Sequence, residues 1–163
     1  MRVYGIIGWK NSGKTGLMER LVEEYCCRGL TVSTIKHAHH NFDVDQPGRD
    51  SYRHRAAGAQ QVLLTSRNRY VLMHELRGAD EPSLHELLSK LAPVDLVLIE
   101  GFKGTAHSKV EVVRAATKRP LLALKNRTIK AIASDTPLSL QRPVFDLNDT
   151  AVIADFILAE VGL

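Results

Sequence analysis

The sequence is poor in cysteine and in aromatic residues, and it has no long apolar run. It contains two cysteines, Cys26 and Cys27, which are neighbours in a segment of helical periodicity, so we expect neither a disulfide between them nor a metal cage. No apolar stretch approaches the ~20 residues that span a bilayer. The apolar start, "VYGII", leads into a glycine-containing loop rather than into a cleavage site. We therefore expect a cytoplasmic protein with no membrane partner.

The excess of positive charge is small. The formal net charge is +4, which favours phosphorylated ligands or an acidic partner. Nucleic-acid-binding surfaces usually carry basic runs interleaved with aromatic residues, whereas aromatic residues make up only 6% of this chain, so we do not expect nucleic acid as a partner. With 163 residues, the chain has the length of one domain with a single core, and we predict one domain over 1–163.

The stretch "GWKNSGKT", residues 8–15, directly follows the apolar run and fits the phosphate-loop pattern G-x-x-x-x-G-K-[ST]. Glycines in such a loop let successive N–H groups point into one concavity, and the following helix adds its positive dipole end. We expect Lys14 to reach the β- and γ-phosphates and the Thr15 hydroxyl to bind Mg²⁺. The alternative is an ordinary Gly/Asn/Ser turn between a strand and a helix. The residues expected to hold the nucleotide are Gly8, Asn11, Ser12, Gly13, Lys14, Thr15 and Gly16.

Short apolar segments alternate with segments of helical periodicity along the whole chain. The predicted strands are 2–8, 30–37, 61–66, 69–76, 94–101, 109–114, 120–125 and 129–135, with 61–66 and 69–76 as a pair. The predicted helices are 15–28, 49–59, one that begins at Pro82, and a last one that is capped by Asn148 or Asp149 and buries Val152, Ile153, Phe156, Ile157 and Val161. This alternation predicts the α/β P-loop NTPase class, with a mostly parallel open sheet in three layers covered by helices on both faces.

Two acidic residues lie on the strand "VDLVLIEG" as candidates to hold the metal. Asp95 and Glu100 are five residues apart, about 16 Å along a strand, so both cannot serve one ion. Ligands of parallel sheets bind at the carboxyl ends of the strands. Glu100 ends the strand at that edge, and we predict that it holds Mg²⁺ or its water, while Asp95 is a solvated residue at the strand start.

The polar stretch "HAHHNFDVDQPGRDSYRHR", residues 37–55, leaves the carboxyl end of a predicted strand. We predict that it behaves as a switch-like loop around the γ-phosphate and its metal, with Asp45 as a metal-side carboxylate. Arg53 is the candidate catalytic cation for the charge that develops in the transition state. His37, His39 and His40 would form a metal site in an alternative interpretation, although no cysteine accompanies them.

Three segments together, "GWKNSGKT", "DVDQPGRDSYRHRAAGA" and "DLVLIEGFK", resemble the molybdopterin-guanine dinucleotide biosynthesis protein B (MobB-type) family. The resemblance implies a P-loop fold, binding of GTP with Mg²⁺, slow GTP hydrolysis and a homodimer. It also implies partnership with the guanylyltransferase that attaches GMP to molybdopterin, with molybdopterin itself as a further candidate ligand. The positions that match the family motifs are Gly8, Gly13, Lys14, Thr15, Asp45, Pro47, Gly48, Asp50, Arg53 and Glu100.

One departure concerns the base. The N-K-x-D tetrapeptide with which many GTPases recognise guanine does not occur in this sequence, so the preference for GTP rests on the family resemblance. No general base or water-positioning glutamine is recognisable either, which predicts at most a weak GTPase. Two other functions stay open: a small-molecule kinase whose lid would be residues 45–55, and a metallochaperone GTPase that uses the histidines of 37–40. Trp9 either covers the nucleotide or packs on a partner.

Overall fold

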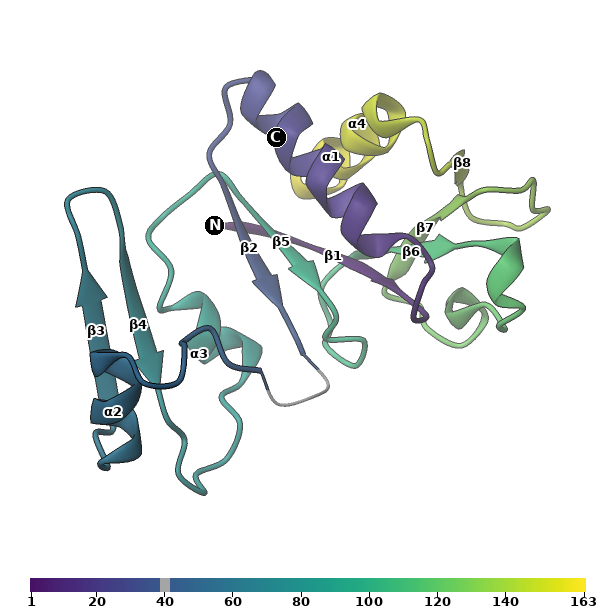
Figure 1. The fold of residues 1–163 in the computed structure, drawn as a ribbon. Coiled ribbons are helices and arrows are strands. Elements are labelled where there is room, and N and C mark those ends of the chain that lie inside the picture. The colour runs from purple at the N-terminus through teal and green to yellow at the C-terminus, as the bar shows by residue number, and fades with distance from the viewer. Residues whose placement is uncertain (39–41) are drawn as a thin grey trace. The chain divides into compact units, whose positions relative to one another are not determined.

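The computed structural model describes residues 1–38 and 42–163, and its contacts divide the chain into two compact units. Unit 1 comprises Met1–His37 and Ser89–Leu163, and unit 2 comprises Ala38–Leu88. Figure 1 shows the elements of both units, which are described separately below. The single domain predicted over 1–163 stays a prediction. His39 and His40 of the histidine-rich stretch lie outside the described residues.

A six-stranded sheet forms the centre of unit 1. Its strand order is β2-β5-β1-β6-β7-β8, and every neighbouring pair is parallel. The strands are β1 (Arg2–Gly8), β2 (Val32–Lys36), β5 (Leu96–Glu100), β6 (Lys109–Val113), β7 (Ile129–Ser134) and β8 (Val144–Asp146). Strands β1 and β5 are almost fully buried, as expected for central strands covered on both faces. The mostly parallel α/β sheet predicted from the sequence is confirmed.

Two long helices pack together on one face of this sheet. Helix α1 (Lys14–Cys27) and helix α4 (Thr150–Val161) lie side by side in Figure 1, and their apolar residues join those of the sheet in the main core. A smaller cluster around Ile7, Ile129 and Ile132 covers the other face together with the 3₁₀ helix η2 (Leu122–Leu124). In the described parts of the chain, no helix is both long and apolar enough to cross a bilayer.

Several sequence predictions are corrected by the elements that form. The segment 120–125 is not a strand: the buried Glu111 carboxylate accepts the N–H groups of Leu122 (2.8 Å) and Ala123 (2.7 Å), which fixes the turn of η2 instead. The short strand β8 was not predicted. The helix predicted from Pro82 is the short α3 (Leu84–Leu88), whose five residues make little more than one helical turn.

Helix α4 begins at the predicted cap, but not every residue predicted to be buried on it is buried. Asp149 is its cap, because its carboxylate accepts the N–H of Val152 (3.2 Å). Ile153 and Ile157 are buried as predicted, whereas Val152 is 43% exposed. The stripe that faces the core includes Ala154 instead, since a helix repeats every 3.6 residues.

Unit 2 contains helix α2 (Asp50–Ala56), the antiparallel pair β3 (Gln61–Thr65) and β4 (Tyr70–His74), and helix α3. The predicted strand pair is confirmed. Its apolar side chains are largely uncovered, with Leu63, Leu64 and Leu72 each more than half exposed (61%, 52% and 51%). We call the pair β3–β4 the ribbon.

Candidate nucleotide-binding site

The loop between β1 and α1 has a backbone that only glycine permits at its two ends. Gly8 has φ 153° and Gly13 has φ 96°, both in the region that L side chains rarely adopt. A Cβ on Gly8 would lie 2.4 Å from the Val112 carbonyl oxygen and 2.6 Å from Ser12 Oγ. The glycine spacing noted in the sequence is therefore a steric requirement of a loop that closes tightly against the neighbouring strand β6.

Helix α1 begins at Lys14 with its N-terminal N–H groups available. Gly13 is the capping position, and neither a side-chain cap nor an acidic residue in the first turn satisfies these groups. Within the described chain, the buried Ser12 hydroxyl also has no hydrogen-bond partner. Thr15 and Gly16 follow in the first turn. Such a helix start, with unpaired donors and the positive dipole end, is suited to an anion.

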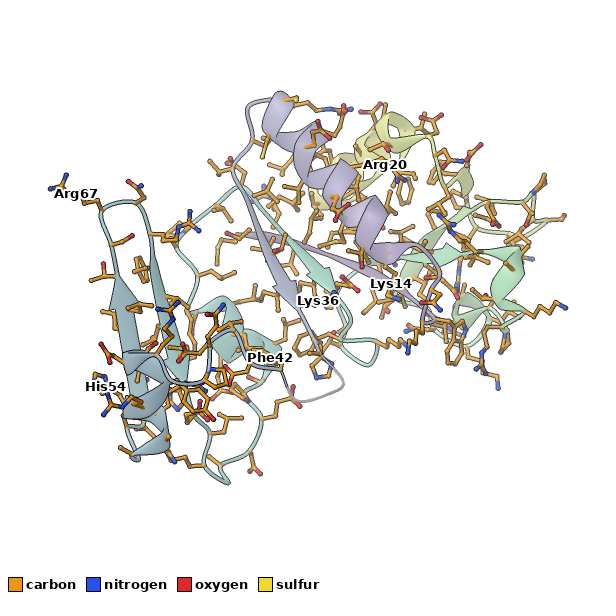
Figure 2. All side chains as sticks on the ribbon, viewed as in Figure 1. Lys14, Arg20, Lys36, Phe42, His54 and Arg67 are labelled. Atoms are coloured by element: carbon orange, nitrogen blue, oxygen red, sulfur yellow. The ribbon has the colours of Figure 1, made fainter. Side chains whose placement is uncertain are left out.

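The Lys14 side chain folds back onto the loop. Its Nζ donates a hydrogen bond to the Trp9 carbonyl oxygen (2.7 Å), and Figure 2 labels it at the start of α1. Burial lowers the pKa of the Lys14 ammonium, and Lys103 and Lys36 lower it further, while the Glu100 charge opposes them. An anionic phosphate at this point would stabilise the charged ammonium more than a neutral carbonyl oxygen does.

Glu100 stands at the same edge of the sheet as the loop. It ends β5, where it lies opposite Ile6 of β1 and Lys36 of β2. Its carboxylate is 3.5 Å from Lys36 Nζ, and its side chain is 13% exposed. The loop and Glu100 thus lie at the same edge of the sheet in unit 1, as expected from the direction of the strands. The role of Glu100 as a metal ligand stays a prediction.

Asp95 lies at the opposite end of β5 and has a role that the sequence analysis missed. Its carboxylate accepts hydrogen bonds from the Thr31 backbone N–H (2.8 Å) and hydroxyl (2.6 Å). These bonds hold the pKa of Asp95 below its usual value. Asp95 therefore anchors the chain just before β2, rather than being only a solvated strand start.

The other two predicted site residues belong to unit 2. Asp45 accepts hydrogen bonds from the Ser51 hydroxyl (2.9 Å), the Gln46 N–H (3.0 Å) and Arg55 Nε (3.3 Å). Arg53 is exposed on α2, with Asp50 at 3.8 Å. The metal role of Asp45 and the catalytic role of Arg53 stay predictions.

Arg55 is the residue of unit 2 that sequence reasoning did not single out. Its guanidinium binds Asp43 and Glu75, each at 2.8 Å, besides Asp45. The hydrogen bonds from Arg55 lower the pKa of Asp43. Arg55 thereby joins the segment before α2 to the end of the ribbon. The three carboxylates that it binds are spread over residues 43–75, so no local sequence pattern predicts this network.

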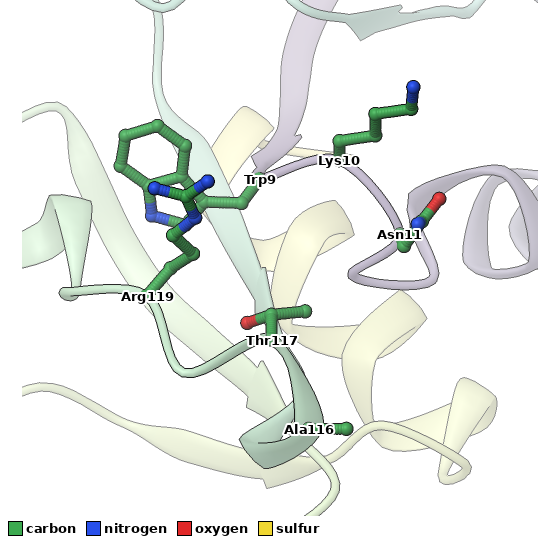
Figure 3. Close-up of a pocket in the computed structure, with 6 residues that line it drawn as sticks. All are labelled: Trp9, Lys10, Asn11, Ala116, Thr117 and Arg119. Atoms are coloured by element: carbon green, nitrogen blue, oxygen red, sulfur yellow. The ribbon is translucent and has the colours of Figure 1, made fainter.

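Trp9 packs within its own unit. Its Nε1 donates to the Pro120 carbonyl oxygen (2.8 Å), and Lys103 Nζ and Arg119 Cζ lie 4.9 Å and 5.6 Å from the ring centroid. A hollow of about 380 Å³ lies beside it, and Figure 3 shows the residues that line this hollow. That hollow is lined by Trp9, Lys10, Asn11, Ala116, Thr117 and Arg119. The indole therefore shapes the surface next to the phosphate loop.

A buried lysine holds the loop that carries Lys103. The Lys109 ammonium donates to the carbonyl oxygens of Thr105 (2.5 Å) and His107 (2.7 Å) and to the Thr128 hydroxyl (3.0 Å). Burial lowers the pKa of Lys109 to about 8, and burial beside this lysine lowers the pKa of His107 to about 4. The sequence contains one indication of this crowding, the glycine inside β1: a Cβ on Gly5 would lie 2.5 Å from His107 Nε2.

The metallochaperone alternative depends on the histidines of residues 37–40, two of which lie outside the described residues. Among the residues that the structure describes, no group of three or more His, Cys, Asp or Glu side chains is arranged to hold a metal ion. His39 and His40 are outside those residues.

The geometry defines the class of protein. A parallel sheet, a glycine-bounded loop after its central strand, an uncapped helix start and an acidic residue at the end of the adjacent strand are the parts of a P-loop nucleotide-binding protein. Residues 3–135 match the model of the family described as MobB, molybdopterin guanine dinucleotide synthesis protein B. The chain belongs to this family, and the resemblance noted in the sequence is confirmed.

Relatives and solved structures support this membership over most of the chain. It is 40% identical over 153 residues to the molybdopterin-guanine dinucleotide biosynthesis adapter protein of Escherichia coli, covering 92% of this chain and 87% of that protein. It is 38% identical to the protein of the same description from Haemophilus influenzae, over 94% and 85% of the two chains. A MobB homologue from Bacillus stearothermophilus superposes with a TM-score of 0.71 at 29% identity, over 99% of both chains.

Proposed function

We propose that this chain is a nucleotide-binding adapter in the synthesis of molybdopterin-guanine dinucleotide, and that it holds GTP with Mg²⁺ for a guanylyltransferase partner. The observation that carries the proposal is the loop 8–13, which presents the uncapped start of α1 and the Lys14 ammonium at one point. The relatives named above are described as adapter proteins of this biosynthesis, which supports a partner in the same pathway.

Different residues of the chain are proposed to bind the phosphates and the metal. The N–H groups of the loop and of the first turn of α1 would bind phosphate oxygens, and Lys14 would leave the Trp9 carbonyl for the β- and γ-phosphates. Thr15 and Glu100 would hold Mg²⁺, which bridges phosphate oxygens and neutralises their charge. Hydrolysis by this chain alone is proposed to be slow. Asp45 and Arg53 are proposed as metal-side carboxylate and charge-stabilising cation, respectively.

The exposed ribbon of unit 2 supports a homodimer. Helix α2 contacts β3, but much of the apolar surface of the ribbon stays exposed, and exposed apolar surface of this kind is suited to contact with another chain. Leu63 and Leu72 lie opposite each other in the ribbon and are both exposed. A second copy of the chain that covers these residues would bury them. A cytoplasmic location is also proposed, in keeping with the two exposed free thiols of Cys26 and Cys27.

Calorimetric titration of the purified chain tests the nucleotide proposal. We expect GTP to bind in the presence of Mg²⁺, ATP to bind more weakly, and Lys14→Ala to weaken GTP binding by about 100-fold, since a charged partner of phosphate is lost. Lys130→Ala, at an exposed position of β7, is the matched control for loss of one lysine charge. If Lys14→Ala folds and binds GTP as the parent does, the phosphate-loop assignment is wrong.

A further inference from the structure

Arg114, directly after β6, places a positively charged side chain beside the phosphate loop. In β6, Val110 and Val112 point to the face that α1 covers, where both join the main core. Side chains alternate along a strand, so Arg114, two residues after Val112, continues on the same side. Its carbonyl oxygen accepts both the N–H (3.0 Å) and the hydroxyl (2.8 Å) of Thr117, which fixes the backbone there. Arg114 is therefore set at the end of β6 toward the start of α1.

The guanidinium of Arg114 lies directly against the loop. A Cβ built on Gly13 would lie 2.9 Å from Arg114 Nε and 3.4 Å from its Cζ. The side chain thus covers the residue that caps α1, and glycine at position 13 is what leaves room for it. Among the described residues, the guanidinium forms no ion pair with any acidic group, and Arg114 is exposed to solvent.

This arrangement is electrostatically unfavourable without an anion. The start of α1 is the positive end of a helix dipole, its first turn holds no acidic residue, and Lys14 adds a second positive charge. A cation placed at the positive end of a helix is repelled by it, and among the described residues no carboxylate pairs with Arg114, while Glu100 acts on the Lys14 side of the loop. Local conflicts of this kind are expected at functional or strained sites.

We propose that Arg114 binds the phosphates of the nucleotide from the β6 side of the loop. The inference rests on the proposed function, because it needs a nucleotide in loop 8–13. Strand β1 has two neighbours: β5 brings Glu100 to one side of the loop, and β6 brings Arg114 to the other. A planar guanidinium donates two parallel hydrogen bonds to phosphate oxygens. The phosphates therefore lie between a metal side and a guanidinium side, and Arg114 acts without the metal.

Titration of GTP, GDP and guanosine, each with Mg²⁺ and with EDTA, tests this assignment on the full chain. We expect Arg114→Ala to weaken GTP and GDP by about tenfold in both conditions, since a charge-assisted contact to phosphate is lost, and to leave guanosine unchanged. Arg114→Lys should recover part of the affinity, because an ammonium keeps the charge but not the paired donors. Arg127→Ala, at an exposed arginine before β7, is the control for loss of one positive charge.

The stability of the free protein separates binding from a structural role. Since no acidic partner is lost, the melting temperature of Arg114→Ala without nucleotide should equal or exceed that of the parent, and a lower value would contradict the electrostatic argument. Unchanged GTP affinity in Arg114→Ala, or a loss seen only with Mg²⁺, would overturn the proposal. If Lys14→Ala weakens GTP while Arg114→Ala does not, the inference alone fails. If neither variant has an effect, the proposed function fails with it.

Discussion

The six-stranded sheet of unit 1 and the ribbon of unit 2 are built from similar apolar residues but use them in opposite ways. In β5, Leu96, Val97, Leu98 and Ile99 are completely buried. In the ribbon, the facing residues Leu63 and Leu72 are mostly exposed. The first pattern holds a rigid edge on which a phosphate loop can be placed, whereas the second leaves apolar surface for another molecule. Sequence hydrophobicity alone does not distinguish a residue that is buried in the core from one that stays exposed on the surface.

The largest expected effect tests this contrast through stability. Leu98→Ala should lower the free energy of unfolding by about 3 kcal/mol, because a leucine in a close-packed core leaves a cavity. Leu72→Ala should change it by less than about 0.5 kcal/mol at low protein concentration, where no second chain covers it. Urea unfolding followed by circular dichroism measures both.

A matching measurement concerns association. If the ribbon is the surface of a homodimer, Leu72→Ala should shift sedimentation toward the monomer, while Leu98→Ala should not do so before it unfolds the chain. Equal stability losses in the two variants would remove the distinction between sheet and ribbon.

The next prediction concerns pH and the half-buried His107 of unit 1. Burial lowers the pKa of His107 to about 4, so the folded chain resists a protonation that the unfolded chain accepts near the ordinary histidine pKa of about 6.5. The stabilising effect is complete above pH 6.5 and is lost as the pH falls toward 4. After allowance for partial exposure to water, the loss should be on the order of 2 kcal/mol.

The His107→Gln variant checks the origin of that slope. Unfolding by urea at several pH values between 4 and 7 should show a flatter dependence for the variant, because glutamine does not titrate. Parallel curves for parent and variant would assign the acid sensitivity to other groups.

The two ends of β5 provide a prediction of intermediate size. Glu100→Gln should abolish most of the Mg²⁺ dependence of GTP binding, a change of about tenfold, because an amide does not supply the charge that the metal requires. Asp95→Asn should leave GTP binding unchanged and lower the melting temperature, since Asp95 is bonded to Thr31. Titration with and without Mg²⁺, and thermal melts, measure the two effects. The reverse pattern would mean that the polarity of the site along β5 is wrong.

The smallest expected effect lies in unit 2. Arg53→Ala should leave resting GTP affinity unchanged and slow phosphate release in the presence of a guanylyltransferase by roughly several-fold, if it stabilises developing charge. Arg49→Ala, also exposed and adjacent to α2, is the control. Equal phosphate release from Arg53→Ala and the parent would dispose of the catalytic role.

The phosphate loop was predictable because its requirements are local. Gly8 and Gly13 reflect backbone angles that other residues avoid, and Lys14 follows at a fixed spacing. The position of Glu100 was predictable because strand direction in a parallel sheet determines which end of β5 lies beside the phosphate loop. Both arguments need only short stretches of sequence and general geometry.

The remaining parts depend on contacts between distant segments. Residues 120–125 look like a strand, and only Glu111 from β6 turns them into η2. Arg114 resembles any exposed arginine until β6 and α1 are placed side by side. The network of Arg55 and the burial of Lys109 have the same cause, since their partners are set by the tertiary fold.

The single tryptophan of the chain stands inside the phosphate loop. Its carbonyl oxygen receives the Lys14 hydrogen bond, and its indole is fixed by Pro120 and flanked by two cations. A nucleotide that draws Lys14 away changes the electric field at the only indole, so its emission becomes an optical probe of occupancy that needs no label. If the nucleotide binds as proposed, Trp9 would serve as an internal fluorescent reporter, and rapid mixing with nucleotide would give association and release rates from the unmodified chain.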